Sequence, residues 1–288
     1  MCNNNKIFIH AGWNKTATTF LQRNLFVPIF GEGLIGPNTQ FNDLQRKSPE
    51  QPLLISDESI LGVTIFKRNS CRNIQRFNFL DNWAKIAPNT QFILGVRKHD
   101  DFIESLYRQY LHVGGDMKAE NFIDIHNNNG FIKVEELLYE PILMKLFSLF
   151  PRQHLIYDFD LFKTNPNILI TELFSFIGLD LSDLDELLGK AMNSNSENSS
   201  VGYKSASALR VVNKFVSSPL FPNKPIPKSF FRFMALGKTP RELFQSLPKE
   251  KVKRRLTQNL YESLRDKLDL DWKAIETSYV NISNVKSK

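Results

Sequence analysis

The stretch that most constrains the fold is residues 6–22, KIFIHAGWNKTATTFLQ. Its apolar run at residues 7–9 predicts a buried strand, and a tight turn follows at Gly12. Lys15 and a row of small residues then lead into an amphipathic helix, which we expect to begin at Phe20. A strand, a short loop and a helix start expose main-chain N–H groups and the positive end of the helix dipole. The stretch therefore predicts a phosphate-binding loop.

This loop differs from the common nucleoside-triphosphate loop, which needs Gly, four residues and then Gly-Lys-Ser/Thr. Here Gly12 lies only three residues before Lys15, and no glycine directly precedes the lysine. We expect the tighter loop to hold one terminal phosphate group, with a full charge from Lys15 and hydroxyl donors from Thr18 and Thr19. An ordinary strand-to-helix turn with a capping threonine is the structural alternative.

Apolar strands alternate with helices through the rest of the first two thirds of the chain. We expect strands at 52–56, 92–96 and 154–157, turns at 31–37, and helices at 73–86, from Asp100 or Asp101 to 111, at 135–150 and at 168–177. The alternation predicts an α/β fold, with a parallel β-sheet flanked by helices.

The domain organisation follows from length and composition. A chain of 288 residues fits one large domain. The polar loop at 193–200 separates an expected α/β core (6–192) from a mainly helical cap (193–288), which is expected to cover the binding sites partly. The best helix of the cap is expected at 250–268, with a short one after it.

The positive charge of the chain is concentrated in one segment. The net charge is +7, and residues 198–241 hold eight basic residues and no acidic one. A solvated basic face and a face that meets an anionic partner both remain open. Within this segment residues 222–234, PNKPIPKSFFRFM, fit a core-facing aromatic helix, which we favour, or a surface that touches a membrane or a charged acceptor.

The sequence offers few signs of export or metal binding. Cys2 and Cys71 are too few for a disulfide framework and have no partners at metal-ligand spacing, so no metal is expected. No signal peptide and no membrane-spanning run are visible. We expect a cytoplasmic protein, with peripheral attachment to a membrane surface as the alternative.

A second constellation lies after the third expected strand. Arg97 stands at its carboxyl end, where ligands bind in open α/β sheets, and Ser105 lies on the following helix. Together they can clamp a second phosphate, with the arginine as a two-pronged donor. A structural salt bridge from Arg97 to Asp100 or Asp101 is the alternative.

With both constellations in place, the chain resembles the sulfotransferase family that uses 3′-phosphoadenosine-5′-phosphosulfate. The KTATT loop and the segment VRKHDDFIESLYRQY carry the resemblance, which covers roughly residues 6–200. It implies a P-loop nucleotide-kinase-like architecture. It also implies that the loop holds the 5′-phosphosulfate and that Arg97 and Ser105 hold the 3′-phosphate. The loop residues concerned are Lys15, Thr16, Ala17, Thr18 and Thr19.

Two parts of this resemblance are looser. Ala17 stands where the family usually has glycine, which is tolerable if the residue is helical and only its N–H is used. By analogy with the family segment that folds over the nucleotide, Ser199, Tyr203 and Lys204 are candidate contacts to the 3′-phosphate or adenine. Turn formation is the alternative for such residues.

Sulfuryl transfer should resemble phosphoryl transfer, with in-line geometry and charge collecting on the leaving oxygen. Lys15 is expected to stabilise that charge. The acceptor, a hydroxyl or an amine, needs a base, for which Glu58 is the first candidate and Asp57 the reserve. His10 and His99 also lie near strand ends, where either can be structural.

Two other classes of function remain open. The segment LLISDE looks like a strand that ends in a Mg²⁺-holding acid, so a P-loop kinase or another Mg²⁺-dependent nucleoside-triphosphate enzyme is the main alternative. The basic segment leaves a nucleic-acid-binding protein as the third class, although no nucleic acid is expected. The expected partners are the nucleotide donor, released as adenosine 3′,5′-bisphosphate, and an unidentified acceptor, with an anionic or membrane-associated one left open.

Overall fold

The fold is built on one parallel β-sheet. The computed structural model describes residues 6–13, 15–35, 52–62, 72–126, 130–179, 201–248 and 255–279. Within these ranges, five strands lie in the order β2-β3-β1-β4-β5, and every pairing among them is parallel. The strands are β1 (Ile7–His10), β2 (Leu34–Ile35), β3 (Leu53–Ser56), β4 (Gln91–Val96) and β5 (Leu155–Asp158).

The prediction of an α/β fold with a parallel sheet is confirmed, and four of the five strands were predicted. The expectation of turns throughout 31–37 is wrong, because Leu34 and Ile35 pair with β3 as an edge strand. Two residues are too few to show the apolar pattern of a strand. Cys2, Cys71, Ser199 and the expected boundary at 193–200 lie outside the described residues.

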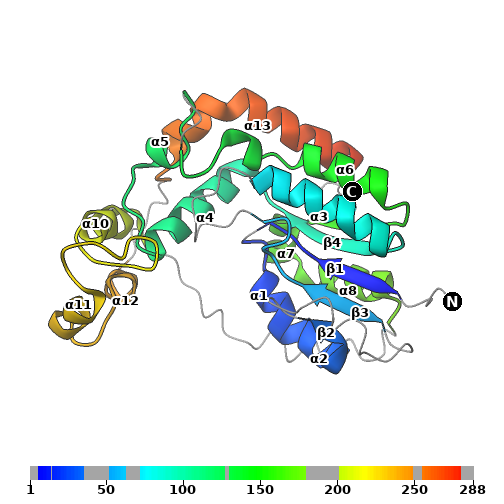
Figure 1. Cartoon of the computed structure of the whole chain (residues 1–288), viewed down its shortest axis with the longest axis horizontal. Coiled ribbons are helices and arrows are strands. Elements are labelled where there is room, and N and C mark those ends of the chain that lie inside the picture. Colours follow the sequence, from blue (N-terminus) through cyan, green and yellow to red (C-terminus); the bar gives the residue numbers. More distant parts are fainter. Residues whose placement is uncertain are drawn as a thin grey trace.

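Helices cover both faces of the sheet, because alternate strand residues point to opposite sides. Ile9 packs into one apolar cluster and Phe8 into another. Figure 1 shows α3, α4, α6 and α13 over the first face and α1, α2 and α8 over the second. Their bounds are α1 (Thr18–Leu21), α2 (Val27–Phe30), α3 (Arg72–Ile86), α4 (His99–His112), α6 (Glu140–Leu149), α8 (Pro166–Ile177) and α13 (Gln258–Ser278). Shorter helices are α5 (Ala119–Phe122), α7 (Phe159–Thr164), α10 (Tyr203–Asn213), α11 (Lys228–Met234) and α12 (Pro240–Gln245).

Several predicted helix boundaries need correction. The first helix begins at Thr18 rather than Phe20. The helix expected at 135–150 begins at Glu140, because Pro141 lacks an N–H and fits only the first turn. Neither Asp100 nor Asp101 caps α4, since the helix already starts at His99.

The C-terminal helix α13 is one continuous helix rather than the two that were expected. It packs over α4 and α6. The carboxylate of Asp271 accepts hydrogen bonds from the main-chain N–H groups of Tyr139 and Glu140, at 3.0 Å each. These N–H groups lie at the start of α6, where intrahelical partners are missing. Asp271 therefore fastens α13 to the α/β core.

The helices α10, α11 and α12 form a separate projection beside the end of α4 (Figure 1). The side-chain amide of Asn213 attaches it, with hydrogen bonds of 2.7 Å to the carbonyl of Leu111 and 2.8 Å to that of Gly115. Helix α11 has no buried residue. The favoured expectation of a core-facing aromatic helix at 222–234 is therefore wrong.

Within the described ranges, none of the helices combines the length and the apolar character needed to cross a membrane.

Candidate functional site

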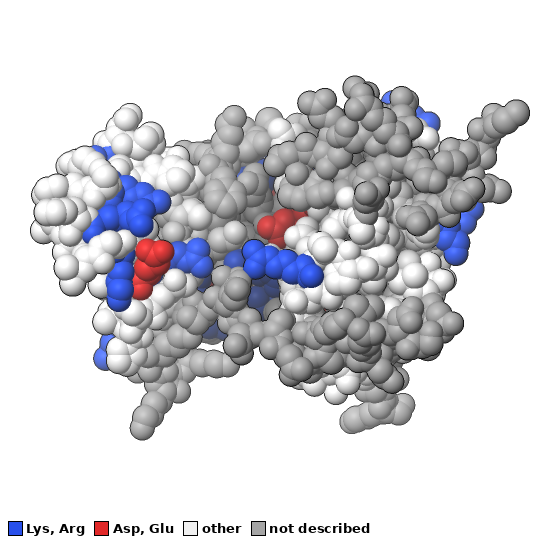
Figure 2. All heavy atoms as spheres, turned by 90° about the horizontal axis from the view of Figure 1, so that it is seen from below, with Lys and Arg blue, Asp and Glu red and all other residues white. Residues whose placement is uncertain are grey.

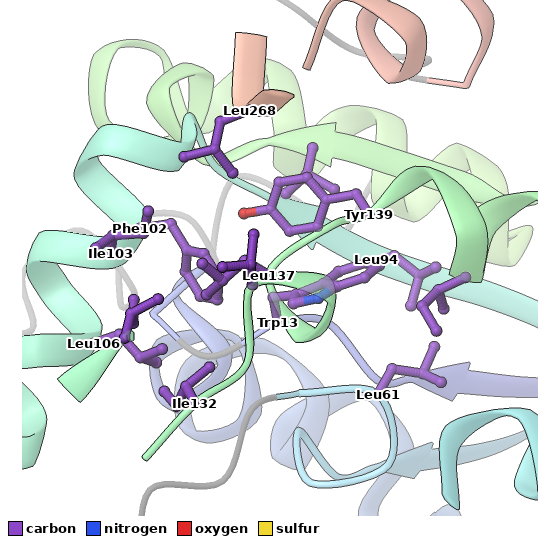
Figure 3. Packing of buried hydrophobic residues seen from close by; sticks show 14 of the residues in the cluster. Trp13, Leu61, Leu94, Phe102, Ile103, Leu106, Ile132, Leu137, Tyr139 and Leu268 are labelled. Carbon is purple, nitrogen blue, oxygen red and sulfur yellow. The ribbon is translucent and has the colours of Figure 1, made fainter. Parts of the chain in front are cut away.

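The loop after β1 is fixed from both sides. Trp13 is fully buried and packs edge-on against Tyr139, with ring centroids 4.6 Å apart (Figure 3). The hydroxyl of Thr16 donates to the carbonyl of Trp13 at 2.6 Å. The hydroxyl of Tyr157, on β5, donates to the carbonyl of Thr16 at 2.8 Å. The loop is therefore a preorganised element of the core.

The loop also lies directly against β4. A Cβ atom added to Gly95 would meet the Thr16 Cβ at 2.6 Å and the Tyr157 ring at 2.7 Å. A Cβ at Gly12 would meet the main-chain nitrogen of Gly95 at 2.8 Å. Only glycine permits these approaches at positions 12 and 95.

Two loop residues adopt left-handed main-chain conformations. Lys15 has φ 71° and Ala17 has φ 65°. The expectation of helical geometry at Ala17 is therefore wrong, and the residue occupies a conformation that glycine adopts more easily. Left-handed residues recur in main-chain nests that bind anions. The following helix start adds further N–H groups without intrahelical partners.

Arg97 extends from the carboxyl end of β4, the strand beside β1. Its guanidinium lies over the Phe159 ring, 4.9 Å from the centroid, and 3.5 Å from the carboxylate of Asp101. The structural salt bridge therefore exists. The Arg97 Nε atom is nevertheless buried without a hydrogen-bond partner in the described part of the chain.

Helix α4 presents a row of polar side chains that continues away from Arg97. Ser105, Gln109 and His112 are spaced four and three residues apart, which places them on one side of the helix. Gln109 Oε1 and His112 Nε2 are buried and lack hydrogen-bond partners among the described residues.

Lys15 lies within a charged group of residues from distant parts of the sequence. Its side chain is exposed, yet the surrounding protein desolvates it and lowers its pKa, while Glu58 opposes the shift. The positive charges of Arg241 and Arg97 lower the pKa of Lys15 further. Arg241, on α12, thus joins a group that otherwise comes from the sheet edge.

His112 is affected by some of the same positive charges. Burial, followed by the charges of Arg241, Lys15 and Arg108, lowers the pKa of its imidazole to about 3. His112 is therefore neutral near pH 7. Figure 2 shows blue basic side chains along the middle of the face that it views, with red acidic side chains among them.

The buried polar atoms test whether the site fits an anionic ligand. Thr18 Oγ1, Arg97 Nε and Arg241 Nε are buried without hydrogen-bond partners in the ranges that the structure describes. Buried donors are normally satisfied, and their cost is recovered when a ligand supplies the acceptor. The donors cluster where Lys15 adds positive charge, so the residues present fit phosphate and sulfate groups.

The candidate bases differ in their surroundings. Glu58 is half-buried and close enough to Lys15 to affect its pKa. The carboxylate of Asp57 accepts the N–H of Ser59 at 2.8 Å and so shapes the turn after β3. Among the four candidates, Glu58 is the carboxylate that the structure brings to Lys15.

The two candidate histidines are part of the core. His10 is fully buried, its Nδ1 lies 2.9 Å from the Ser56 hydroxyl, and burial lowers its pKa to about 3. His99 packs against Tyr139, and its Nε2 lies 3.1 Å from the Asp271 carboxylate. Both positions are structural.

The predicted cap residues lie next to α4. Tyr203 and Lys204 begin α10, two residues after Val201, whose carbonyl accepts a hydrogen bond from Arg108. This segment therefore reaches the helix that carries Ser105. The contacts of both side chains to a nucleotide remain a prediction, and Ser199 lies outside the described residues.

Sequence reasoning missed three residues of this site, namely Gln109, His112 and Arg241. The first two were detectable, because they follow Ser105 at helical spacing. Arg241 had no distinguishing signal among the eight basic residues of its segment.

Among the described residues, no group of three or more His, Cys, Asp and Glu side chains is arranged to hold a metal ion.

Comparison with known proteins gives limited similarity. No protein-family model matches the chain, and no curated protein sequence matches it. Among solved structures, it is similar to a sulfotransferase from Alicyclobacillus acidocaldarius, with 14% sequence identity and a TM-score of 0.45. The match covers 60% of this chain and 81% of that one. The α/β fold is therefore assigned from the chain's own parallel sheet. The candidate anion site lies at the carboxyl ends of the strands of this sheet.

Proposed function

We propose that the protein is a sulfotransferase that moves a sulfuryl group from 3′-phosphoadenosine-5′-phosphosulfate to a hydroxyl or amine acceptor. One observation carries this proposal. Lys15 lies on the loop after β1 and Arg97 at the end of the adjacent parallel strand β4, and the Thr18 Oγ1 and Arg97 Nε donors are buried without partners in the described part of the chain. Two separated cationic positions suit a nucleotide whose phosphate groups are themselves separated.

The chemistry assigns a distinct task to each position. The loop residues Lys15 to Thr19 would hold the 5′-phosphosulfate, and Arg97 with Ser105 would hold the 3′-phosphate. The acceptor atom attacks sulfur as the bond from sulfur to the bridging phosphate oxygen breaks. Glu58 accepts the acceptor's proton, and Lys15 stabilises the charge on the departing phosphate. The products are the sulfated acceptor and adenosine 3′,5′-bisphosphate.

Calorimetry tests the donor site directly. The wild-type protein should bind adenosine 3′,5′-bisphosphate without Mg²⁺ and more tightly than AMP. Arg97→Ala should weaken binding of the bisphosphate by at least about tenfold, the equivalent of one lost charged hydrogen bond, and change AMP binding little. Equal losses for both ligands would show that Arg97 does not read the 3′-phosphate.

Variants of the reacting groups test the transfer step. Lys15→Ala should reduce transfer by about 10²- to 10³-fold, as for other lost transition-state donors, without unfolding the protein, because the side chain is exposed. Glu58→Gln should reduce transfer and leave bisphosphate binding intact, with Asp57→Asn as the matched control. Full transfer activity of the Lys15→Ala variant would contradict the assignment of the protein as a sulfotransferase.

The kinase alternative makes the opposite prediction about metal. An enzyme of that class binds ATP with Mg²⁺ and stops in a chelator, whereas sulfuryl transfer continues there. ATP binding that requires Mg²⁺, without binding of adenosine 3′,5′-bisphosphate, would replace the proposal with that alternative.

A further inference from the structure

The outer end of the projection is an apolar tip, which we define as Phe230, Phe233, Met234 and Leu236. Their side chains are 52%, 82%, 69% and 92% exposed, respectively. The three residues of α11 in this set are spaced three and one apart, so they share one face of the helix. Large apolar side chains scattered singly need no explanation, but four within seven residues form a patch.

Positive charge accompanies the apolar tip in the sequence. Lys228, Arg232 and Lys238 are exposed and lie within the same short segment. The neighbouring acidic residue, Glu242, accepts the main-chain N–H of Thr239 at 2.7 Å and its hydroxyl at 2.8 Å, as part of the cap of α12. An apolar end with exposed cations in the same segment complements a surface whose interior is apolar and whose boundary is negative.

The apolar tip is held in place before any partner arrives. The N–H of Lys228 donates to the Ser217 hydroxyl at 2.9 Å, which fixes the start of α11. After the helix, Leu236 and Gly237 turn the chain with φ values of 51° and 84°. The Arg232 Nε atom donates to the Gly237 carbonyl at 3.1 Å and closes this turn. Leu236 is thereby presented at the outermost point of a rigid turn.

The charge beside the apolar tip favours a membrane over a protein partner. A standard protein–protein interface takes roughly 800 Å² from each partner, of which somewhat over half is apolar. The apolar tip comes from one short helix and its turn, with three exposed cations within residues 228–238. Inserting a few apolar residues below charged headgroups needs no such area, since cations at the rim contribute the remaining attraction.

From these observations we infer that the α11 turn docks the protein on a bilayer containing anionic lipids. Phe233, Met234 and Leu236 would enter the headgroup–acyl boundary, and Lys228 and Lys238 would contact lipid phosphates. This inference rests on residues 228–238 alone and is independent of the proposed transferase activity.

Sedimentation of the full-length protein with vesicles tests the inference. The wild type should bind vesicles of phosphatidylcholine with phosphatidylglycerol, and bind pure phosphatidylcholine much more weakly. The double variant Phe233→Ser with Leu236→Ser should reduce the partition coefficient by about a hundredfold, since each buried side chain contributes roughly tenfold. The pair Lys228→Gln with Lys238→Gln should reduce it by about fivefold per residue, and only on the anionic vesicles.

The matched control removes an exposed leucine from another surface. Leu270 on α13 is 69% exposed, and Leu270→Ser should leave vesicle binding unchanged. A Phe233→Trp variant should shift its fluorescence to the blue when vesicles are added. Vesicle binding that the Phe233/Leu236 double variant retains would overturn the inference. Size-exclusion chromatography that shows a dimer for the wild type and a monomer for this double variant would also overturn the inference, because a second copy would then cover the apolar tip.

Discussion

The edge of the sheet that carries the candidate anion site and the α11 turn use similar residues in opposite ways. Both combine aromatic side chains with exposed cations. At the sheet edge, Trp13 and Tyr157 are fully buried and hold Lys15 on a fixed loop. On α11 no side chain is buried, and Phe233 faces solvent. The comparison teaches that the surroundings, more than the residue type, decide whether an aromatic side chain builds a site or contacts a partner.

The largest expected difference between the two regions is the loss of stability when a glycine is replaced by alanine. Gly95→Ala should lower the free energy of unfolding by about 3 kcal/mol, as for overpacked cores, because its Cβ would overlap Thr16 and Tyr157. Gly237→Ala is the control at the α11 turn, where nothing lies within 4 Å. Its positive φ alone should cost about 1 kcal/mol. Urea unfolding of both variants measures this difference. Equal losses in the free energy of unfolding would contradict the prediction.

Acid should weaken the core through His154. Its Nδ1 accepts the N–H of Phe92 at 3.1 Å, and its Nε2 lies 3.1 Å from the Phe150 carbonyl. Burial lowers its pKa from 6.5 to about 4, although the Phe150 bond opposes the shift. The unfolded chain therefore binds the proton first. Stability is full above about pH 6.5 and falls toward pH 4, by up to about 1.4 kcal/mol per pH unit.

Urea unfolding across this pH range measures the effect. The free-energy difference between the wild type and His154→Gln should shrink as the pH falls. The exposed His126 provides the control variant, His126→Gln, which should leave the pH dependence unchanged. A constant difference between the wild type and His154→Gln would contradict the prediction.

A smaller effect with the same sign is expected in both regions. Ala17 and Leu236 each hold a left-handed conformation without being glycine. Ala17→Gly and Leu236→Gly should each raise the free energy of unfolding by about 1 kcal/mol. Ala84→Gly, in the interior of α3, should lower it by about 1 kcal/mol. Thermal unfolding would refute the explanation if all three variants shifted in the same direction.

The smallest expected effect is on the stability of the α11 turn itself. Phe233→Ser should change the free energy of unfolding by less than about 0.5 kcal/mol, as is usual for exposed positions. Phe102→Ser, in the fully buried cluster, should cost several-fold more. Calorimetric unfolding of the pair measures the contrast. A large loss from Phe233→Ser would mean that the α11 aromatics pack inward.

The sequence was most informative where local pattern and burial agree. The strands of residues 7–10 and 91–96 are apolar because helices cover both faces, so composition alone revealed them. The edge strand at Leu34 and Ile35 was too short to leave such a pattern. Pro141 marked a helix start and was mistaken for an interior residue.

The candidate site divides in the same way. Lys15 was identified from the strand, loop and helix start around it, and Arg97 because it directly follows a strand. Arg241 was not, because its place beside Lys15 depends on how a remote projection packs against α4. The expectation that the α11 aromatics face the core was also wrong, because the sequence of α11 does not show whether its phenylalanines contact the core or solvent.

The bond from Tyr157 to Thr16 has a consequence for how the protein is made. The loop precedes by 141 residues the side chain that holds its carbonyl, so the loop leaves the ribosome before Tyr157 on β5 does. Gly95, against which the loop lies, also comes after it in the chain. A nascent chain that ends before β5 therefore lacks the support that shapes the loop. The candidate anion site gains this support only once β5 has been translated.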